Sequence, residues 1–310
     1  MKQLSLWFAL FSCAVLAVLL PESCTKENGV SDQKGLSKTS ALANGKPSVT
    51  PTANPAIAYL FGKSNSIMVM NADGSNQTAI ISGGVGPAVW SPDGKSLLFE
   101  RTVNSLTTLW LEDVSVVNGK PTGSNLRQIP INLPTSRLNG ERWSPLGDSI
   151  VFVTEETKIY TVSSAGGTPR LAYAPTTGFE DFDPDWSPDG TRIVFDEWND
   201  AWTQTSLKIL TIATGNITIV VPPSPPLIYY PTWSHQGDRI VYSAGGIYTV
   251  TPTTNGARVL VTAGDFPTWS PNGSQLALVS GKSSGIYTYT FSGGTTQALS
   301  GTGTFLDWKR

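Results

Sequence analysis

Hydrophobic residues recur along the chain in short runs, and five of these runs come shortly after a tryptophan. The runs are Leu97–Phe99, Ile150–Val153, Ile193–Phe195, Ile240–Tyr242 and Leu276–Leu278. Each is rich in β-branched or aromatic residues, and a segment with alternating hydrophobic positions follows it, as in Ile159–Val162 and Ile247–Val250. Alternation with a period of two predicts β-strands rather than helices. The pattern therefore predicts an all-β chain of many short strands.

The turn before each run is readable from its residues. Trp-Ser-Pro-Asp-Gly stands at 90–94 and at 186–190, and looser copies begin at Trp143, Trp233 and Trp269. Pro at the second turn position presets the backbone for a type I turn, and Gly tolerates the positive φ that follows. Each tryptophan is thus predicted to close one strand, and the hydrophobic run is the antiparallel partner of that strand.

The tryptophans recur at intervals of 53, 43, 47, 36 and 39 residues, counting Trp308 as the sixth. Two further strands fit inside each interval, separated by a Gly-rich turn such as Ala165–Gly167. A repeat of about forty residues with four strands predicts one propeller blade per unit. One tryptophan per blade is interpreted as packing between blades, because an indole buries about 150–250 Å². A direct ligand role for these six residues is the alternative.

The two ends of the chain are predicted to share a blade. Only Trp308 and two residues remain at the C-terminus, whereas 57–61, 67–70 and 77–81 look like three strands without a tryptophan partner. Joining them closes a ring of six blades and leaves no open sheet edge. The repeated Trp-Ser-Pro-Asp-Gly-x-x-Ile-x-Phe pattern resembles TolB-type six-bladed β-propellers over residues 55–310. The resemblance implies the fold, whereas binding proteins and propeller domains of enzymes both carry this repeat.

The N-terminal residues predict export. Lys2 precedes an uncharged apolar stretch that ends at Leu20, which is typical of a signal peptide over 1–23. Cys24 follows Ser23, and the sequence from Cys24 resembles the start of mature bacterial surface lipoproteins. We therefore expect lipidation of Cys24, a flexible tether over 24–54 and an outer-membrane-anchored protein that faces the periplasm or the surface. Cleavage without lipidation, or an uncleaved anchor, is the alternative.

Charge and residue counts exclude several kinds of site. The net charge is −2 and the basic residues are scattered, so a nucleic-acid partner is not expected. His235 is the one histidine, and it replaces the Pro of a turn, where we expect it to be exposed to solvent. A lone turn histidine does not make a catalytic triad, and a His/Cys zinc site is excluded by count. No metal or other cofactor is expected.

The segment Phe179–Asp185 carries an unusual density of acids. Asp181, Asp183 and Asp185 stand at alternate positions, so an extended strand would point their carboxylates to the same side. Carboxylate oxygens suit Ca²⁺, but the segment lacks the glycine and distal glutamate of a calcium-binding loop. The alternative is a solvated acidic loop in which Asp185 makes a strand-end hydrogen bond.

Strand direction places this acidic segment on one face of the propeller, beside the insertion 196–202 of the same blade. Trp198 and Trp202 lie outside the repeat, so packing between blades does not account for them. We expect them to be exposed, with little effect on stability when replaced; the alternative is that they fold back over the blade edge. The rim of this face is predicted to include Glu141, Arg142, Glu155, Glu156, Asp265, Phe266 and Asp307. The predicted binding residues are Phe179, Asp181, Asp183, Trp198, Trp202, Tyr229 and Tyr230.

Aromatic residues beside acids on a rigid scaffold are typical of a binding surface. The sequence therefore favours a non-enzymatic, lipid-anchored propeller that binds a protein, peptide or glycan of the envelope around its channel. The rival is a carbohydrate-active or other hydrolytic or lyase enzyme that pairs carboxylates such as Asp183 and Glu141. A purely structural module is the third possibility.

Overall fold

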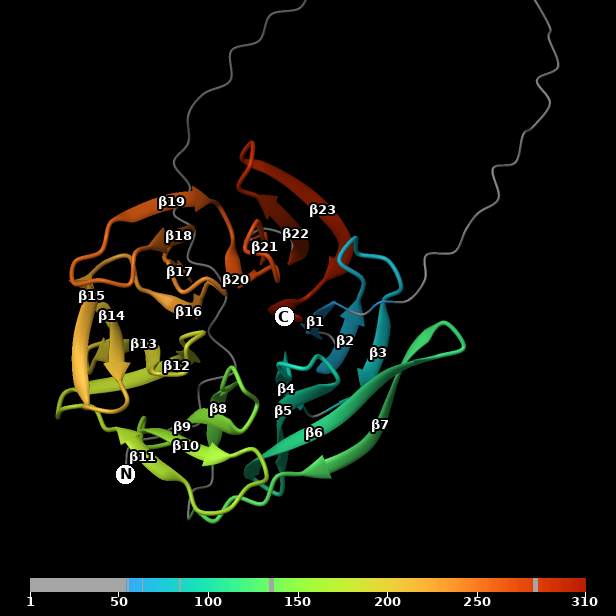
Figure 1. The fold of residues 1–310 in the computed structure, drawn as a ribbon, viewed down its shortest axis with the longest axis horizontal. Coiled ribbons are helices and arrows are strands. Elements are labelled where there is room, and N and C mark those ends of the chain that lie inside the picture. The colour runs from blue at the N-terminus through green and yellow to red at the C-terminus, as the bar shows by residue number, and fades with distance from the viewer. Residues whose placement is uncertain (1–53, 55, 63, 84, 134–136, 281–283) are drawn as a thin grey trace, which may run out of the picture. The chain divides into compact units, whose positions relative to one another are not determined.

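The structure is a computed structural model that describes residues 54–310 except 55, 63, 84, 134–136 and 281–283. The predicted signal peptide, Cys24 and the tether up to residue 53 lie outside the described residues. Within the described residues the regular elements are 24 β-strands, grouped into six four-stranded antiparallel sheets around a common centre (Figure 1). No helix in this part of the chain is long and apolar enough to cross a membrane. The predicted six-bladed propeller is confirmed.

Each blade begins with an inner strand that ends at the repeated tryptophan. The inner strands of blades 1 to 6 are β4 (Val85–Trp90), β8 (Leu138–Trp143), β12 (Phe179–Trp186), β16 (Tyr229–Trp233), β20 (Asp265–Trp269) and β24 (Thr304–Trp308). Inner strands of neighbouring blades contact each other around the ring. These six strands therefore form the wall of the central channel.

The other strands follow outward in the same order of blades. The second strands are β5 (Ser96–Val103), β9 (Ser149–Thr154), β13 (Arg192–Asn199), β17 (Ile240–Ser243), β21 (Gln275–Val279) and β1 (Ile57–Phe61). The third strands are β6 (Leu106–Val117), β10 (Ile159–Ser163), β14 (Thr205–Thr211), β18 (Ile247–Val250), β22 (Gly285–Thr290) and β2 (Ser66–Met70). The outer strands are β7 (Lys120–Gln128), β11 (Arg170–Tyr173), β15 (Asn216–Ser224), β19 (Arg258–Thr262), β23 (Thr295–Thr302) and β3 (Thr78–Ile81).

Blade 6 joins the two ends of the propeller, as predicted. Strand β24 pairs with β1, with Ile57 opposite Trp308 and Ala58 opposite Asp307. In Figure 1 the C-terminus accordingly lies beside β1. A side-chain bond also crosses to blade 1, because the backbone N–H of Trp90 donates to Asp307 Oδ2 at 2.7 Å. The C-terminal strand thus holds the first and last repeats together.

The six repeated tryptophans pack between blades, which confirms the prediction for them. Their side chains are 1–8% exposed. Trp233 lies in one hydrophobic cluster with Val194 and Leu207 of blade 3, and Trp269 lies in another with Val241 of blade 4. Burying each indole against the preceding blade removes a large apolar area from water. The hydrophobic core is therefore divided into six interfaces between neighbouring blades.

The turns after the tryptophans have the predicted geometry. In the first one, Gly94 N–H donates to Ser91 O at 2.8 Å and Gly94 has a φ of 65°. The Ser91 hydroxyl donates to Asp93 Oδ1 at 2.6 Å and accepts from Ser96 N–H at 3.0 Å. Serine and aspartate thus satisfy the turn's polar groups locally. These turns lie at one end of the channel, and the inner strands begin at the other end, which we call the channel mouth.

Candidate functional site

Each inner strand is interrupted by a β-bulge near the channel mouth. The pairing between the inner and second strands shifts register just before the tryptophan in every blade. The residue three places before the tryptophan has a positive φ in five blades. These residues are Gly140 (65°), Asp183 (47°), Tyr230 (53°), Phe266 (51°) and Phe305 (51°). The bulge turns the side chain at this position away from the regular alternation of the strand.

Three of these bulge residues are aromatic, which is costly for the backbone. A bulky side chain at positive φ is a true outlier, and such a conformation costs on the order of 1–3 kcal/mol. Gly140 occupies the same position in blade 2 without that cost. Tyr230, Phe266 and Phe305 belong to consecutive blades, so the strain is concentrated on one side of the channel. Strain of this kind gathers at functional sites and is offset by what the side chains contact.

The aromatic side chains form a continuous arc around that side of the channel. Within it, Tyr230 stacks on Phe266 with ring centroids 4.5 Å apart, and Phe266 contacts Phe305 at 4.5 Å. On the other side of Tyr230, the ring centroid of Tyr229 lies 5.9 Å from that of Tyr230 and 5.0 Å from that of Trp198. Trp198 in turn lies 5.0 Å from Trp202. We call Trp202, Trp198, Phe182, Tyr229, Tyr230, Phe266 and Phe305 the aromatic arc.

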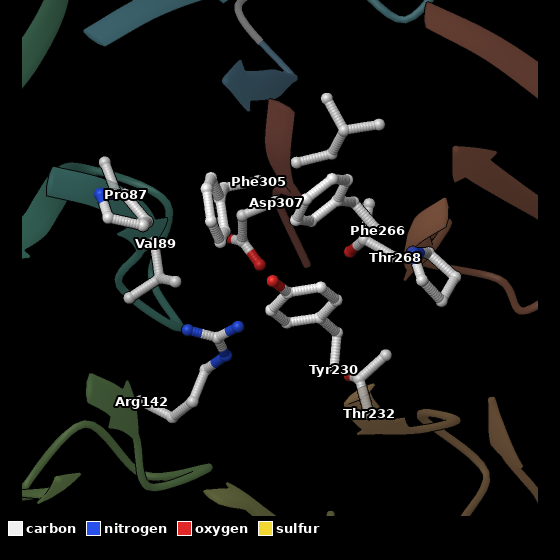
Figure 2. A pocket seen from close by; sticks show the side chains of 12 residues that line it. Pro87, Val89, Arg142, Tyr230, Thr232, Phe266, Thr268, Phe305 and Asp307 are labelled. Atoms are coloured by element: carbon white, nitrogen blue, oxygen red, sulfur yellow. The ribbon is translucent and has the colours of Figure 1, made fainter. Parts of the chain in front are cut away.

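One end of the arc borders a cavity in the channel. Its volume is about 30 Å³. Figure 2 shows Arg142, Tyr230 and Asp307 pointing toward one another across it, with Phe266 and Phe305 beside them. The remaining lining is mostly small or apolar, including Pro87, Val89 and Thr268. A cavity of this size holds roughly two water molecules, so only the polar tip of a ligand group would enter it.

The inner strands are rich in acidic residues. The six inner strands carry seven carboxyl groups and a single guanidinium, that of Arg142. The seven are Glu141, Glu180, Asp181, Asp183, Asp185, Asp265 and Asp307. The whole chain, by contrast, has a net charge of only −2. The acids are thus concentrated on the inner strands, and four of them, Glu180, Asp183, Asp265 and Asp307, are partly exposed.

Asp183 and Asp196 form the acid pair beside the arc. Asp183 Oδ2 accepts from Tyr230 N–H at 3.3 Å, and Asp196 Oδ2 accepts from the Trp198 indole at 2.6 Å. Burial raises the pKa of Asp183, and the nearby Arg142 opposes that rise. Burial and then Asp183 raise the pKa of Asp196 well above its usual range. Like charges held close together in a desolvated place do not all ionise at neutral pH.

Asp181 belongs to a separate cluster within blade 3. It lies opposite Glu197 in the pairing of β12 with β13, and it is fully buried. Burial and Glu197 raise the pKa of Asp181 to about 8, although Lys208 opposes the rise. Lys208 forms an ion pair with Glu197. Asp181 therefore faces the blade interior, and the prediction that it belongs to the binding face is not supported by its position.

Glu141 faces Glu100 rather than Asp183. Glu141 is 3% exposed, and burial raises its pKa to about 7. The pKa of Glu100 rises to about 8 because of burial and the nearby Glu141. Gly86 leaves room for the Glu100 side chain, because a Cβ atom on residue 86 would lie 2.2 Å from Glu100 Cγ. Glu141 is thus buried between blades 1 and 2, and the expected rim position for it is wrong.

Asp185 and Asp307 connect blades, and both accept from the tryptophan of the following blade. Asp185 Oδ2 accepts from Trp233 N–H and from the Thr232 hydroxyl, both at 2.9 Å. This is the strand-end bond expected for Asp185, but the segment is a buried strand and not a solvated loop. Burial raises the pKa of Asp307 to about 6, and Arg142 is the first group that opposes the rise.

The three aspartates considered for Ca²⁺ do not converge. The bulge between Phe182 and Asp185 breaks the alternation, so Asp181, Asp183 and Asp185 point to three different surroundings. In the described part of the chain there is no group of three or more His, Cys, Asp or Glu side chains placed to hold a metal ion. Regular alternation, as assumed from the sequence, puts the three carboxylates on one side of the strand, and the spacing of residues in the sequence does not reveal a bulge.

The predicted binding residues divide into two groups. Trp198, Trp202, Tyr229 and Tyr230 meet in the aromatic arc, and Asp183 lies beside it. Phe179 is 38% exposed at the start of β12, and its ring lies 5.8 Å from Lys208 Nζ. The expectation that Trp198 is exposed is wrong: its side chain is only 5% exposed. Trp202 is half-buried. The alternative, in which Trp198 and Trp202 fold back over the blade edge, therefore describes these two residues better than exposure does.

Phe182, Phe305 and Asp196 were not among the predicted binding residues, although Phe182 and Asp196 lie in the two segments that were predicted to meet on this face. A signal for Phe305 was present, because Tyr230, Phe266 and Phe305 each stand three residues before a tryptophan. Comparing equivalent positions of the repeats therefore finds the bulge residues. The pairing of Asp196 with Asp183 depends on the bulge and has no such signal.

His235 lies at the turn end of the channel, away from the arc. It is half-buried, and its Nε2 atom is buried. Burial and then Arg310 lower the pKa of His235 to about 4. The histidine is therefore neutral at physiological pH, and the expectation of a fully exposed turn residue is wrong.

Comparison with known proteins supports the fold alone. No family model and no curated protein matches the chain. Among solved structures, it is similar to TolB from Acinetobacter baumannii, with 17% identity over 83% of this chain and 67% of that one, and a TM-score of 0.61. A nidogen/laminin complex matches with 12% identity, 82% and 98% coverage and a TM-score of 0.65. An oligogalacturonate lyase in complex with manganese matches with 14% identity, 80% and 74% coverage and a TM-score of 0.52. These neighbours include both binding proteins and lyases.

Proposed function

We propose that the chain is a non-enzymatic binding protein that captures a protein, peptide or glycan of the bacterial envelope at the channel mouth. The observation that supports this most is the aromatic arc, whose rings contact one another across four blades. Three of its residues are strained bulge residues, and they carry the arc to the edge of the cavity. Clustered aromatic residues at the centre of a concave surface are typical of the residues that dominate binding energy.

The positions of the acids favour binding over catalysis. A general acid or base must come within hydrogen-bond reach of the substrate. Asp181, Glu141 and Asp196 all have a raised pKa, but each is at most 3% exposed. Their place behind the channel wall suits an electrostatic role better than direct proton transfer.

A photo-crosslinking experiment tests the proposed face. A photoreactive phenylalanine analogue replaces Phe179, which is 38% exposed at the channel mouth. The matched control carries it at Leu146, which is 86% exposed in the turn at the opposite end of the channel. Irradiation in the envelope fraction of the source organism is expected to give a discrete adduct from position 179 and none from 146. Adducts from 146 alone would place binding on the opposite face.

We also propose that Cys24 is lipidated and that the protein is anchored to the outer membrane. The support is the short apolar segment that ends before Ser23 and Cys24. Cys24→Ser is expected to move the protein from the membrane to the soluble fraction and to abolish labelling by a fatty-acid probe. Labelling that persists in the variant would contradict lipidation at this residue.

A second candidate function is a hydrolase or lyase that uses channel carboxylates. The observation in its favour is that Asp183 and Asp307 are partly exposed in the channel and have raised pKa values. Raised pKa values are common among the carboxyl groups of active sites. If this function is correct, the purified protein cleaves a panel of neutral or uronic-acid glycans, and Asp183→Asn abolishes cleavage. Absence of products across the panel would reject it.

A further inference from the structure

We propose that the channel mouth recognises a positively charged side chain, the ammonium of lysine or the guanidinium of arginine, in a bound peptide segment. This inference rests on the proposed binding function and names the chemistry of its ligand. Its first support is the set of inner strands, which carry four partly exposed carboxyl groups, those of Glu180, Asp183, Asp265 and Asp307, and a single guanidinium, that of Arg142. One guanidinium cannot balance four carboxyl groups, so the channel offers more acceptors than cations.

The geometry at the mouth places carboxylates on both sides of Tyr230. From blade 3, Asp183 Oδ2 accepts from Tyr230 N–H at 3.3 Å. From blade 5, Asp265 Oδ1 accepts from Phe266 N–H at 2.9 Å, and the Phe266 ring stacks on Tyr230. The bulge backbone therefore orients one oxygen of each carboxylate. Both aspartates are partly exposed, so the second oxygen of each can accept from a ligand.

A third carboxyl group, that of Asp196, lies close to Asp183. Asp196 is fully buried, and its Oδ2 accepts a hydrogen bond from the Trp198 indole. Its Oδ1 is buried without a hydrogen-bond partner among the described residues. A buried carboxyl group with an unpartnered oxygen costs folding free energy. A cation at the mouth favours the ionised form of this group and so offsets part of that cost.

The aromatic arc supplies the rest of a cation site. Lysine and arginine pack their apolar stems along aromatic rings and place the charge over a ring face. The same contact occurs within this protein, where the Arg192 guanidinium carbon lies 4.6 Å from the Trp233 ring centroid. A metal cation is a poorer match, because no group of three or more metal-binding side chains is found in the described residues.

Arg142 limits how deep the cation can enter. Arg142 follows the bulge position of its strand, Gly140, by two residues and so lies closer to the turn end of the channel. Its Nη1 donates to Glu141 O at 2.9 Å. Figure 2 shows its guanidinium directed into the cavity toward Tyr230 and Asp307. A ligand cation is repelled at that depth and attracted at the level of Asp183 and Asp265. The two levels together define a site for the tip of one side chain.

The test uses short peptides that are identical except for one central residue, which is lysine, arginine, acetyllysine or glutamate. Binding to the full-length protein in detergent is measured by calorimetry at low and at high salt. We expect lysine and arginine to bind about tenfold tighter than acetyllysine at low salt, and glutamate not to bind. The preference is expected to shrink at high salt because the carboxylates at the mouth are partly exposed.

Variants then assign the preference to residues. Asp183→Asn and Asp265→Asn are expected to bring the affinities for the lysine and acetyllysine peptides within about twofold of each other, while binding of the acetyllysine peptide persists. Glu156→Gln is the matched control, because Glu156 is 66% exposed on the same face but outside the channel. Thermal melts of each variant confirm that it is folded.

The outcomes separate this inference from the proposed function. Equal affinity for lysine and acetyllysine, or an unchanged preference in both aspartate variants, would overturn the cation site but leave binding at the mouth intact. If no peptide binds while position 179 still gives an envelope adduct, the cation site is likewise rejected and the binding function stands. A loss of preference in Glu156→Gln equal to that in Asp183→Asn would show a general surface-charge effect and reject the site.

Discussion

The burial of Trp198 has a large expected effect on stability. Its side chain is 5% exposed and contacts three other rings of the aromatic arc, those of Phe182, Trp202 and Tyr229. Truncating a buried tryptophan to alanine typically costs about 3–5 kcal/mol. The change also removes the indole that donates to Asp196 Oδ2, and an unsatisfied buried acceptor costs about 1–3 kcal/mol. We therefore expect Trp198→Ala to lower the free energy of unfolding by about 4 kcal/mol or more.

Two matched variants separate the contributions. Trp198→Phe keeps most of the ring and loses the donor, so its expected cost is about 1–3 kcal/mol. Trp202→Ala removes a half-buried ring from the same cluster and is expected to cost about 1 kcal/mol. Unfolding in urea is followed by circular dichroism, because the variants differ in tryptophan fluorescence. If Trp198→Ala costs no more than Trp202→Ala, Trp198 is not a core residue and belongs to an exposed surface.

The remaining predictions concern ring closure, pH and backbone strain. Deleting 305–310, which removes most of β24, should lower the melting temperature far more than deleting 25–50, and equal melting temperatures would contradict closure through blade 6. Burial raises the pKa of Asp181 to about 8 in the folded protein. The protonated carboxyl group therefore stabilises the fold fully below the pKa that Asp181 has in the unfolded chain, and this stabilisation is lost as the pH rises through about 8. The melting temperature should therefore fall between pH 5.5 and 8.5, and Asp181→Asn should reduce that fall; an unchanged pH dependence in the variant would refute it. Phe266 has a φ of 51°, so Phe266→Gly should be about 1 kcal/mol less destabilising than Phe266→Ala, and the reverse order would show that the bulge is not strained.

Sequence reasoning was most successful where structure is local. The Ser91–Gly94 turn closes through its own backbone and side chains, and the same residue types recur after the other tryptophans. Because one repeat predicts the next, the unpaired strands at the two chain ends were enough to predict closure between β24 and β1. The packing of the six tryptophans between blades followed from the same periodicity.

The candidate site depended on the tertiary structure for two physical reasons. The first is distance along the chain: Tyr230, Phe266 and Phe305 are 36 and 39 residues apart and meet only because the blades are arranged in a ring. The second is the bulge, since one extra residue in a strand redirects every side chain beyond it.

Asp181, Asp183 and Asp185 show the effect of the bulge most clearly. Alternation in the sequence put their carboxylates on a common side, whereas the fold directs Asp181 to Glu197, Asp183 to the channel and Asp185 to the backbone of blade 4. The amino-acid sequence alone determined that this segment is acidic and precedes a blade tryptophan. Which of its carboxylates are desolvated, and which one faces the channel, was decided by the neighbouring strands, because burial and charge proximity are properties of the packed ring.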